Sequence, residues 1–199
     1  EIMSGNREIN YTYYHWGPFL YKTSLTTDEV NEVKKLCSKN STSAGEKLAG
    51  LIEHEYKVEV EKLFPIINPY LQSYARAYKN YTTETLGNKI ELKSAWVNYM
   101  TKFESNPLHT HIDDLSFVLF TQVPKGLLQE NNNLKQNKQP GCLNFMYVLE
   151  HKKLLINKHT FFPKEGDFFI FPACLHHYVN SFKCEGERIS VSGNLKITE

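Results

Sequence analysis

The sequence predicts an α+β fold in which N-terminal helices pack against an antiparallel β-sandwich or jelly roll. Three observations support this prediction. Helical periodicity is confined to residues 1–85. Short runs suited to strands, separated by turn residues, then continue to the end of the chain. Aromatic residues make up 13% of the sequence, including 12 Tyr and 12 Phe, and aromatic side chains favour strands.

The N-terminal part begins with an aromatic stretch and a well-marked helix start. Residues 11–24 are predicted to be extended, with a break at Gly17-Pro18. Thr26 and Glu29 have the spacing of a capping box, in which each side chain satisfies a backbone N–H at the start of a helix. Because an apolar stripe follows, the sequence predicts a helix from this point.

Two more helices are expected before the pattern changes to strands. Residues 47–64 show helical periodicity with charged side chains on an expected solvent face. Pro65 is expected to interrupt this helix, because proline has no N–H and its ring clashes with the preceding turn. A further helix is expected over residues 68–80.

The second part of the chain is predicted to consist of strands and one long loop. Residues 123–141 are polar, rich in Asn and Gln, and bounded by Pro and Gly. Loops of this length are usually functional or mobile, so this segment is a candidate lid or substrate contact. The expected strands cover residues 89–101, 115–122, 143–149, 160–162, 167–171, 176–181 and 187–197.

Composition limits the class of protein. One domain is expected over residues 1–199, with 1–85 as mainly helical support and 86–199 as the jelly-roll core. A net charge of +1 argues against a nucleic-acid-binding surface. No apolar run approaches the ~18–20 residues of a membrane span. The four cysteines lack the paired spacing of a zinc site, and we expect free thiols in a reducing cytoplasm.

Three metal-capable side chains occupy alternate positions in the stretch His109-Thr-His111-Ile-Asp113. On an extended backbone all three project to one face. Iron(II) that activates O2 is held by two histidines and one carboxylate, which leave three adjacent positions open. The His-x-Asp pair of such a site is His111 with Asp113, although His109 competes with His111 for the same role.

The remaining ligand and an anion-binding group are expected from the last strands. His176 and His177 are adjacent, so only one of them can face the metal. Arg188 can bind a carboxylate with two parallel hydrogen bonds, and Ser190 lies on the same face of the strand. A His-x-Asp pair, a distant His and an Arg-x-Ser pair in this order are more specific than any one of them alone.

These segments resemble the 2-oxoglutarate- and Fe(II)-dependent oxygenases, in particular a small branch common in marine microbes and their phages. The similar stretches are WGPFLY, LAGLIEHEY, WVNYM, HTHIDDLS, PKEGDFFIFPACLHHYV and ERISVSGN, which together span most of the chain. The resemblance implies a double-stranded β-helix core with a cupin-like jelly roll. It also implies that 2-oxoglutarate chelates iron and is decarboxylated to succinate, with O2 supplying an oxidant that hydroxylates a C–H bond.

The resemblance also implies roles for single residues. His111, Asp113 and His177 would hold the iron, with His109 on the pocket wall, and Arg188 would bind the distal carboxylate of 2-oxoglutarate. Ser190 would assist Arg188, and Tyr99 and Asn98 are candidates for a further hydrogen bond to 2-oxoglutarate.

Several alternatives to this interpretation stay open at this point. A cupin-like metal enzyme would need no 2-oxoglutarate, and a jelly-roll binding module would need no catalysis. The substrate is expected to be a small molecule or a peptidyl group, with no membrane partner and no nucleic acid. The oligomeric state stays open, with a homodimer as one possibility. The expected location is the cytoplasm, which would be that of the host if a phage encodes the chain.

Overall fold

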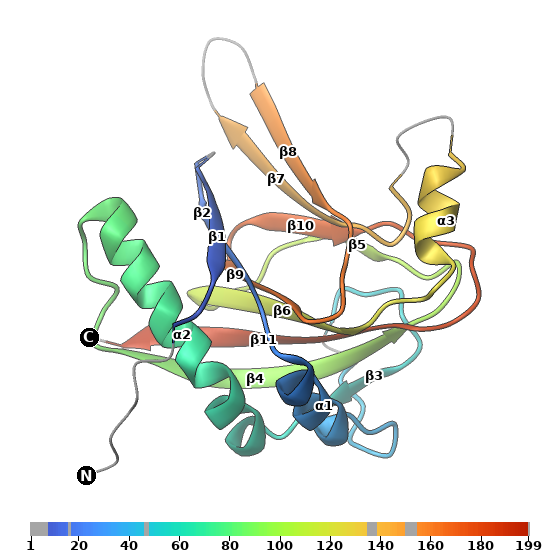
Figure 1. The fold of residues 1–199 in the computed structure, drawn as a ribbon, viewed down its shortest axis with the longest axis horizontal. Coiled ribbons are helices and arrows are strands. Elements are labelled where there is room, and N and C mark those ends of the chain that lie inside the picture. Colours follow the sequence, from blue (N-terminus) through green and yellow to red (C-terminus); the bar gives the residue numbers. More distant parts are fainter. Residues whose placement is uncertain (1–7, 16, 46–47, 135–138, 150–154, 199) are drawn as a thin grey trace.

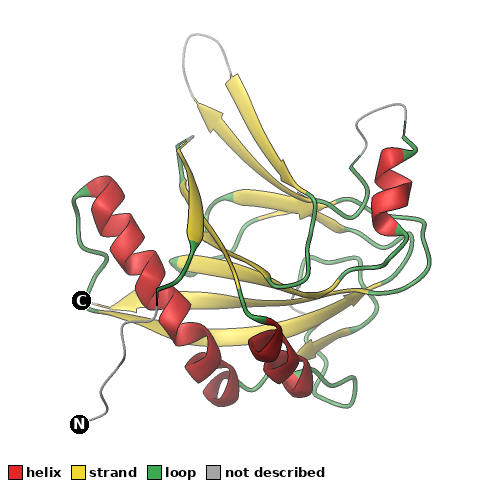
Figure 2. Cartoon of the chain, in the orientation of Figure 1, coloured by secondary structure: helices red, strands yellow, loops and turns green. Residues whose placement is uncertain are grey.

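The computed structural model describes residues 8–15, 17–45, 48–134, 139–149 and 155–198, and it contains two facing β-sheets (Figures 1 and 2). The larger sheet has the strand order β1-β2-β9-β6-β11-β4-β3 and the smaller sheet the order β5-β10-β7-β8. The strands of the larger sheet are Tyr11–His15 (β1), Phe19–Ser24 (β2), Glu55–Lys57 (β3), Lys89–Met100 (β4), Leu115–Gln122 (β6), Asp167–Pro172 (β9) and Arg188–Thr198 (β11). Those of the smaller sheet are Asn106–His109 (β5), Leu143–Leu149 (β7), Leu155–Phe161 (β8) and His176–Val179 (β10).

Every strand pair in the described residues is antiparallel, and the two facing sheets form the predicted jelly roll. The helices are Thr27–Leu36 (α1), Val60–Thr82 (α2) and Leu127–Asn132 (α3). In Figure 1, α1 and α2 cover the outer face of the larger sheet, and the smaller sheet lies on its other side. This arrangement of helices and sheets confirms the predicted fold class. Among the residues that the structure describes, none of the helices combines the length and the apolar character needed to cross a membrane.

The capping box at the start of α1 is present as expected. Thr26 Oγ1 accepts a hydrogen bond from Glu29 N, and the Glu29 carboxylate accepts one from Thr26 N at 2.9 Å. Tyr70 of α2 also donates to that carboxylate, at 2.6 Å. The helix start is therefore fixed both within α1 and against its neighbour.

The predicted helix over residues 47–64 is wrong, and so is the predicted break at Pro65. Residues 55–57 form strand β3, and α2 runs without interruption through Pro65 and Pro69. A proline inside a helix removes one backbone hydrogen bond and costs about 3 kcal/mol. The buried face of α2 offsets that cost, because full burial of one large apolar side chain stabilises by about 1.5–3 kcal/mol. The buried apolar side chains of α2 are Leu63, Ile67, Tyr70, Leu71, Tyr74 and Ala77.

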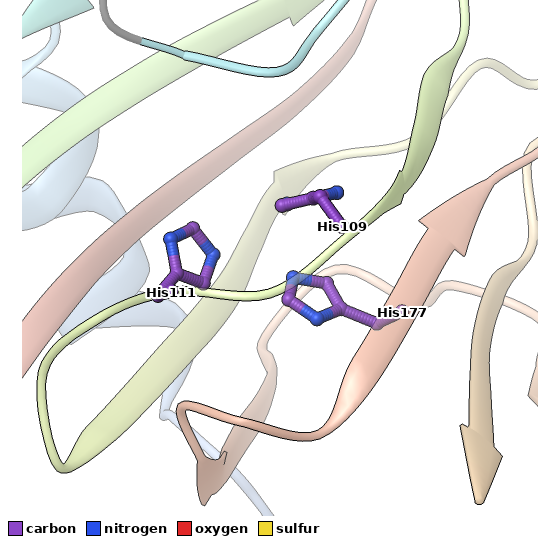
Figure 3. A group of neighbouring side chains, drawn as sticks. All are labelled: His109, His111 and His177. Atoms are coloured by element: carbon purple, nitrogen blue, oxygen red, sulfur yellow. The ribbon is translucent and has the colours of Figure 1, made fainter.

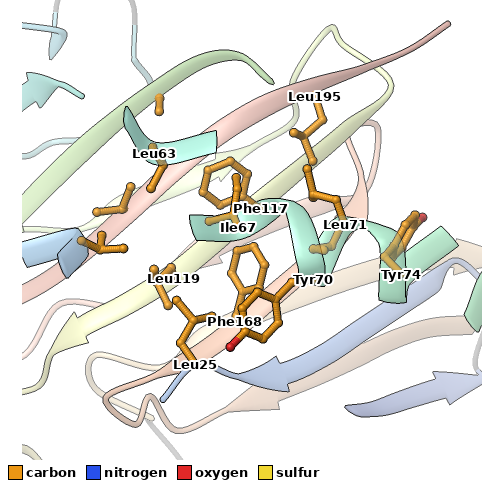
Figure 4. Close-up of a cluster of buried hydrophobic side chains, with 14 of the residues drawn as sticks. Leu25, Leu63, Ile67, Tyr70, Leu71, Tyr74, Phe117, Leu119, Phe168 and Leu195 are labelled. Atoms are coloured by element: carbon orange, nitrogen blue, oxygen red, sulfur yellow. The ribbon is translucent and has the colours of Figure 1, made fainter. Parts of the chain in front are cut away.

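Strand alternation divides the interior into two cores. In β9, Phe168 and Ile170 pack toward the helices, whereas Phe169 and Phe171 pack between the sheets. This explains the continuous apolar run DFFIFP, because a strand buried on both faces has no polar side. Figure 4 shows the helix-facing core, in which the side chains of α2 meet Phe117 and Phe168. The core between the sheets supports the cavity described below.

The sequence predicted a polar loop over residues 123–141, but this segment is not a simple loop. They contain α3, whose Leu127 is fully buried in the core between the sheets. The Glu130 carboxylate accepts hydrogen bonds from the backbone N–H groups of Lys183 and Cys184 at 2.9 and 2.8 Å. The described part of this segment is therefore anchored to the body of the protein.

Gly193 is required where β11 crosses the helix-facing core. A Cβ at this position would lie 2.5 Å from Phe117 Cε1 and 2.5 Å from the Ser94 carbonyl oxygen. Gly193→Ala is expected to lower the free energy of unfolding by about 1–3 kcal/mol, because the backbone oxygen cannot move aside. The measurement is chemical denaturation, with Gly45→Ala as the control, since a Cβ at Gly45 meets nothing closer than 3.4 Å.

Candidate metal centre and adjoining cavity

Three histidines come together where the two sheets meet the end of β5. His109 is the last residue of β5 and pairs directly with His177 of β10. His111 follows two residues later, and the centre of its ring lies 5.0 Å from that of His109. One nitrogen from each ring lies within 4.8 Å of the other two, and Figure 3 shows the rings grouped around a common space.

Backbone carbonyls fix the orientation of two of these rings. His109 Nδ1 lies 2.7 Å from the Pro107 carbonyl oxygen, and His177 Nδ1 lies 2.9 Å from that of Leu175. A carbonyl can only accept, so each Nδ1 donates its proton there and each Nε2 keeps a free lone pair. Metal-binding histidines are usually held in this way by a second partner.

The surroundings of the three rings keep them neutral. Burial lowers the pKa of His109 below its usual value. Burial, with the neighbouring histidines, lowers the pKa of His111 to about 4 and that of His177 to about 3. Neutral imidazole is the form that binds a metal, and three imidazoles suit Fe(II) among other divalent ions.

Asp113 is not part of this group, and no other carboxylate among the described residues joins it. The chain bends at residues 112–114, so the alternation that carries His109 and His111 to one face stops before Asp113. The next residue holds the bend in place: Asp114 accepts a hydrogen bond from Ile197 N at 2.7 Å. The structure thus brings together three histidines where the sequence suggested His111, Asp113 and His177.

The two adjacent histidines of β10 face opposite ways, as strand geometry requires. His177 is buried in the histidine group, whereas His176 is exposed on the other side of the strand. His177 pairs with His109 on one neighbouring strand and with Phe145 on the other.

One cavity opens beside the three histidines and extends to Arg188. Its walls come from both sheets, from His111 and from Ile52, which precedes β3. It is lined by Ile52, Trp96, Asn98, Met100, Asn106, His109, His111, Phe117, Val118, Leu143, His177, Val179, Arg188, Ser190 and Ser192. None of these residues comes from 123–141, so the described part of that segment does not reach the cavity.

Arg188 is a buried cation without an acidic partner among the described residues. It is 2% exposed, and its Nε donates to the Gly141 carbonyl oxygen at 3.0 Å. Its guanidinium carbon lies 4.6 Å from the centre of the Phe120 ring, and one terminal nitrogen has no hydrogen-bond partner in the described structure. Burial lowers the pKa of Arg188 to about 9, so the site favours an anion that would restore the charge balance.

Ser190 lines the cavity as expected, but Tyr99 does not. Tyr99 belongs to the helix-facing core, because on β4 it points away from the face that carries Asn98. The Asn98 side-chain nitrogen lies 3.5 Å from Ser190 Oγ and 3.4 Å from Ser192 Oγ. Of the two residues expected from β4, Asn98 therefore lines the cavity and Tyr99 does not.

Three further polar or aromatic residues of the cavity were not singled out from the sequence. Ser192 could have been found, because it continues the alternation of Arg188 and Ser190 along β11. Trp96 packs its ring 5.8 Å from that of His111. Asn106 has a buried side-chain oxygen without a partner in the described structure. Trp96 and Asn106 carry no pattern in the sequence that marks them as part of a site.

Comparisons with known proteins agree with this geometry. Residues 94–194 match a family model described as "Putative 2OG-Fe(II) oxygenase". This match runs from within β4 to within β11 and includes every residue of the histidine group and Arg188. A search of curated proteins by sequence finds no match.

Solved structures share the fold at low sequence identity. A prolyl-4-hydroxylase from Pseudomonas putida aligns with a TM-score of 0.59 and 15% identity, covering 90% of this chain and 93% of that one. The viral collagen prolyl hydroxylase from Paramecium Bursaria Chlorella virus-1, in complex with 2OG, aligns at 0.53 and 12%, covering 90% and 96%. HygX from Streptomyces hygroscopicus, with nickel and 2-oxoglutarate bound, aligns at 0.50 and 10%, covering 90% and 83%. On the family match and the site, the chain belongs to the 2OG-Fe(II) oxygenases, which use Fe(II), 2-oxoglutarate and O2.

Proposed function

We propose that this oxygenase is a hydroxylase that holds iron with His109, His111 and His177 and holds 2-oxoglutarate with Arg188 and Ser190. The observation that carries the proposal is that one cavity is lined both by the three histidines and by a buried arginine without an acidic partner. A metal site and an anion site in one cavity are what a chelating dicarboxylate requires.

The residues of the chain divide the work between the two ends of the cavity. His109, His111 and His177 would hold the iron with three protein ligands, which would leave room at the metal for the co-substrate and O2. The bound iron supplies O2 activation coupled to loss of CO2 from 2-oxoglutarate. Arg188 binds and orients the distal carboxylate, and the Ser190 hydroxyl adds a donor beside it. The apolar side chains of Ile52 and Val179 keep bulk water from this space.

Two other hypotheses were open from the sequence, and the site favours neither. A cupin-like enzyme that uses no 2-oxoglutarate has no need for a buried arginine in the metal cavity. A non-catalytic binding module has no need for three neutral histidines whose ring nitrogens converge beside a cavity. Both features are present together, and the family match covers both.

Anaerobic titration tests the proposal. Addition of Fe(II) and 2-oxoglutarate to the protein is expected to give a visible metal-to-ligand charge-transfer band, because 2-oxoglutarate chelates the metal. Admission of O2 is then expected to release succinate slowly even without substrate. A protein that gives neither the band nor succinate would refute the proposed function.

The substrate is proposed to be a small molecule or a peptidyl group. Two of the structures that share the fold are prolyl hydroxylases, so peptidyl proline is the first candidate to test. Increased succinate release on addition of a prolyl peptide, together with a gain of one oxygen atom in the peptide, would identify that substrate. We also propose a cytoplasmic location. The oligomeric state is proposed to be a homodimer, which size measurements in solution would test.

A further inference from the structure

A buried carboxyl group lies beside the cavity and has no role in the site described so far. Glu55 of the edge strand β3 is 2% exposed, and neither of its carboxylate oxygens has a hydrogen-bond partner in the described structure. Burying an ionised carboxylate without a donor is costly, so such a group is usually paired or neutral. Glu55 is not in the histidine group.

The strand register places Glu55 next to Asn98. Glu55 is directly opposite Asn98 on β4, and the flanking bond from Tyr99 N to the His54 carbonyl oxygen measures 2.9 Å. In an antiparallel ladder hydrogen-bonded pairs alternate with non-bonded pairs, so Glu55 and Asn98 form a non-bonded pair, in which side chains come closest. Directly opposite side chains also lie on the same face of the sheet.

The Asn98 side chain has one satisfied end and one unsatisfied end. Its nitrogen is directed to Ser190 Oγ and Ser192 Oγ, while its Oδ1 is buried without a partner in the described structure. An ionised Glu55 carboxylate and Asn98 Oδ1 can both only accept a hydrogen bond, so one added proton would allow these opposite side chains to pair. A neutral carboxyl has an O–H that can supply this proton.

The environment of Glu55 opposes a negative charge. Burial, with a smaller contribution from Glu104, raises the pKa of Glu55 to about 7. The Glu104 carboxylate is stabilised by hydrogen bonds from Thr101 N and Glu53 N, at 2.6 and 2.7 Å. No ion pair among the described residues joins Glu55 to Arg188, which lies on the same face of the sheet.

Two glycines that precede β3 lie close to the carboxyl group of Glu55. A Cβ at Gly50 would lie 2.7 Å from Glu55 Oε1, and a Cβ at Gly45 would lie 3.4 Å from Oε2. The backbone at Gly50 thus comes close to the carboxyl oxygen because no side chain intervenes.

We propose that Glu55 is a positioning residue, which stays protonated and donates its O–H to Asn98 Oδ1, so that the Asn98 amide keeps its NH2 group toward Ser190 and Ser192 in the cavity. The hydrogen bond joins the edge of the larger sheet to the place where Arg188 and Ser190 would hold 2-oxoglutarate. The effect on 2-oxoglutarate rests on the proposed function, whereas the protonation state of Glu55 does not.

The protonation state is measured directly by infrared spectroscopy of the metal-free protein. At about pH 6, one pH unit below the raised pKa, the difference spectrum between wild type and Glu55→Gln is expected to contain the C=O stretch of a neutral carboxylic acid. Absence of this band would overturn the proposal whatever the protein binds.

The positioning role is measured through the affinity for 2-oxoglutarate, by calorimetry of the Mn(II)-loaded protein without O2. Glu55→Met has a similar size but no donor, and it is expected to raise the Kd about tenfold, the effect of one lost hydrogen bond. Glu55→Gln is neutral and has an NH2 donor, so it is expected to restore the affinity to within about threefold of wild type.

Each outcome of this comparison has a defined meaning. Equal affinity of wild type and Glu55→Met for 2-oxoglutarate overturns the positioning role. An equal loss of affinity in Glu55→Met and Glu55→Gln also overturns it, because that result would mean that the negative charge of Glu55 is needed and not its O–H. Failure of wild type itself to bind 2-oxoglutarate would count against the proposed function, with the infrared result still deciding whether Glu55 is neutral. If Glu55→Met does not fold, Asn98→Leu removes the same hydrogen bond from its other end and is expected to give at least the same loss.

Discussion

His109→Ala is expected to abolish tight Fe(II) binding, whereas Asp113→Ala is expected to leave it nearly unchanged. The physical reason is that His109 contributes one of the three converging nitrogens, while Asp113 lies within the bend at residues 112–114 and outside the histidine group. Loss of an outer partner of a metal ligand typically costs 10–100-fold in affinity, so loss of a ligand should exceed about 100-fold. Anaerobic titration of the metal-free protein with Fe(II) measures both affinities.

Two further variants sharpen this prediction. His176→Ala is the matched control, because His176 is adjacent to His177 but exposed on the opposite side of β10. His111→Asp places a carboxylate two residues after His109 and is expected to keep the metal, since two histidines and one carboxylate also form a facial set. If Asp113→Ala lost iron while His109→Ala retained it, the pair His111 and Asp113 would be the true ligands.

The difference between the ligand set suggested by the sequence and that of the structure has a local cause. Alternate residues share a face only while the backbone is extended, and the sequence does not show where the extension ends. Here it ends after His111, because Asp114 is bonded to Ile197 N and pairs with Lys196 at 3.1 Å. Those partners lie more than 80 residues away in the chain, and such contacts leave no local pattern.

The strands of the jelly roll were predictable because their patterns are local. The run DFFIFP has no polar face, and it forms a strand buried between two cores. The alternation of Arg188 and Ser190 correctly placed both on the cavity face of β11. The same alternation shows why Tyr99 could not share that face with Asn98.

Residues 47–64 show the opposite case, in which local pattern misled. Mixed charged and apolar residues there fit a helix, but Glu55–Lys57 pairs with the edge of the larger sheet instead. Proline rules predicted an end at Pro65, whereas packing of α2 against the sheet keeps the helix continuous. Tertiary contacts decided both cases, and they are not visible in a short window of sequence.

Arg188→Met is expected to change co-substrate affinity and stability in opposite directions. Arg188 can give a carboxylate two charge-assisted hydrogen bonds, each contributing about 1.5–3 kcal/mol, so the Kd for 2-oxoglutarate should rise by roughly 100-fold or more. Without 2-oxoglutarate the same guanidinium is a buried charge with no acidic partner among the described residues. Its replacement by an apolar side chain of similar length is therefore expected to stabilise the free protein, by about 1–4 kcal/mol.

Calorimetry of the Mn(II)-loaded protein and thermal unfolding of the metal-free protein measure the two effects. Arg188→Lys is the control, because it keeps the charge but lacks the planar fork, and it should lose affinity without the gain in stability. A variant Arg188→Met that bound 2-oxoglutarate normally would show that the anion lies elsewhere. A loss of both affinity and stability would mean that Arg188 supports the fold through Gly141 and Phe120. The opposite signs follow only if the cavity keeps an uncompensated charge for an incoming anion, because a purely structural arginine would lower both quantities when removed.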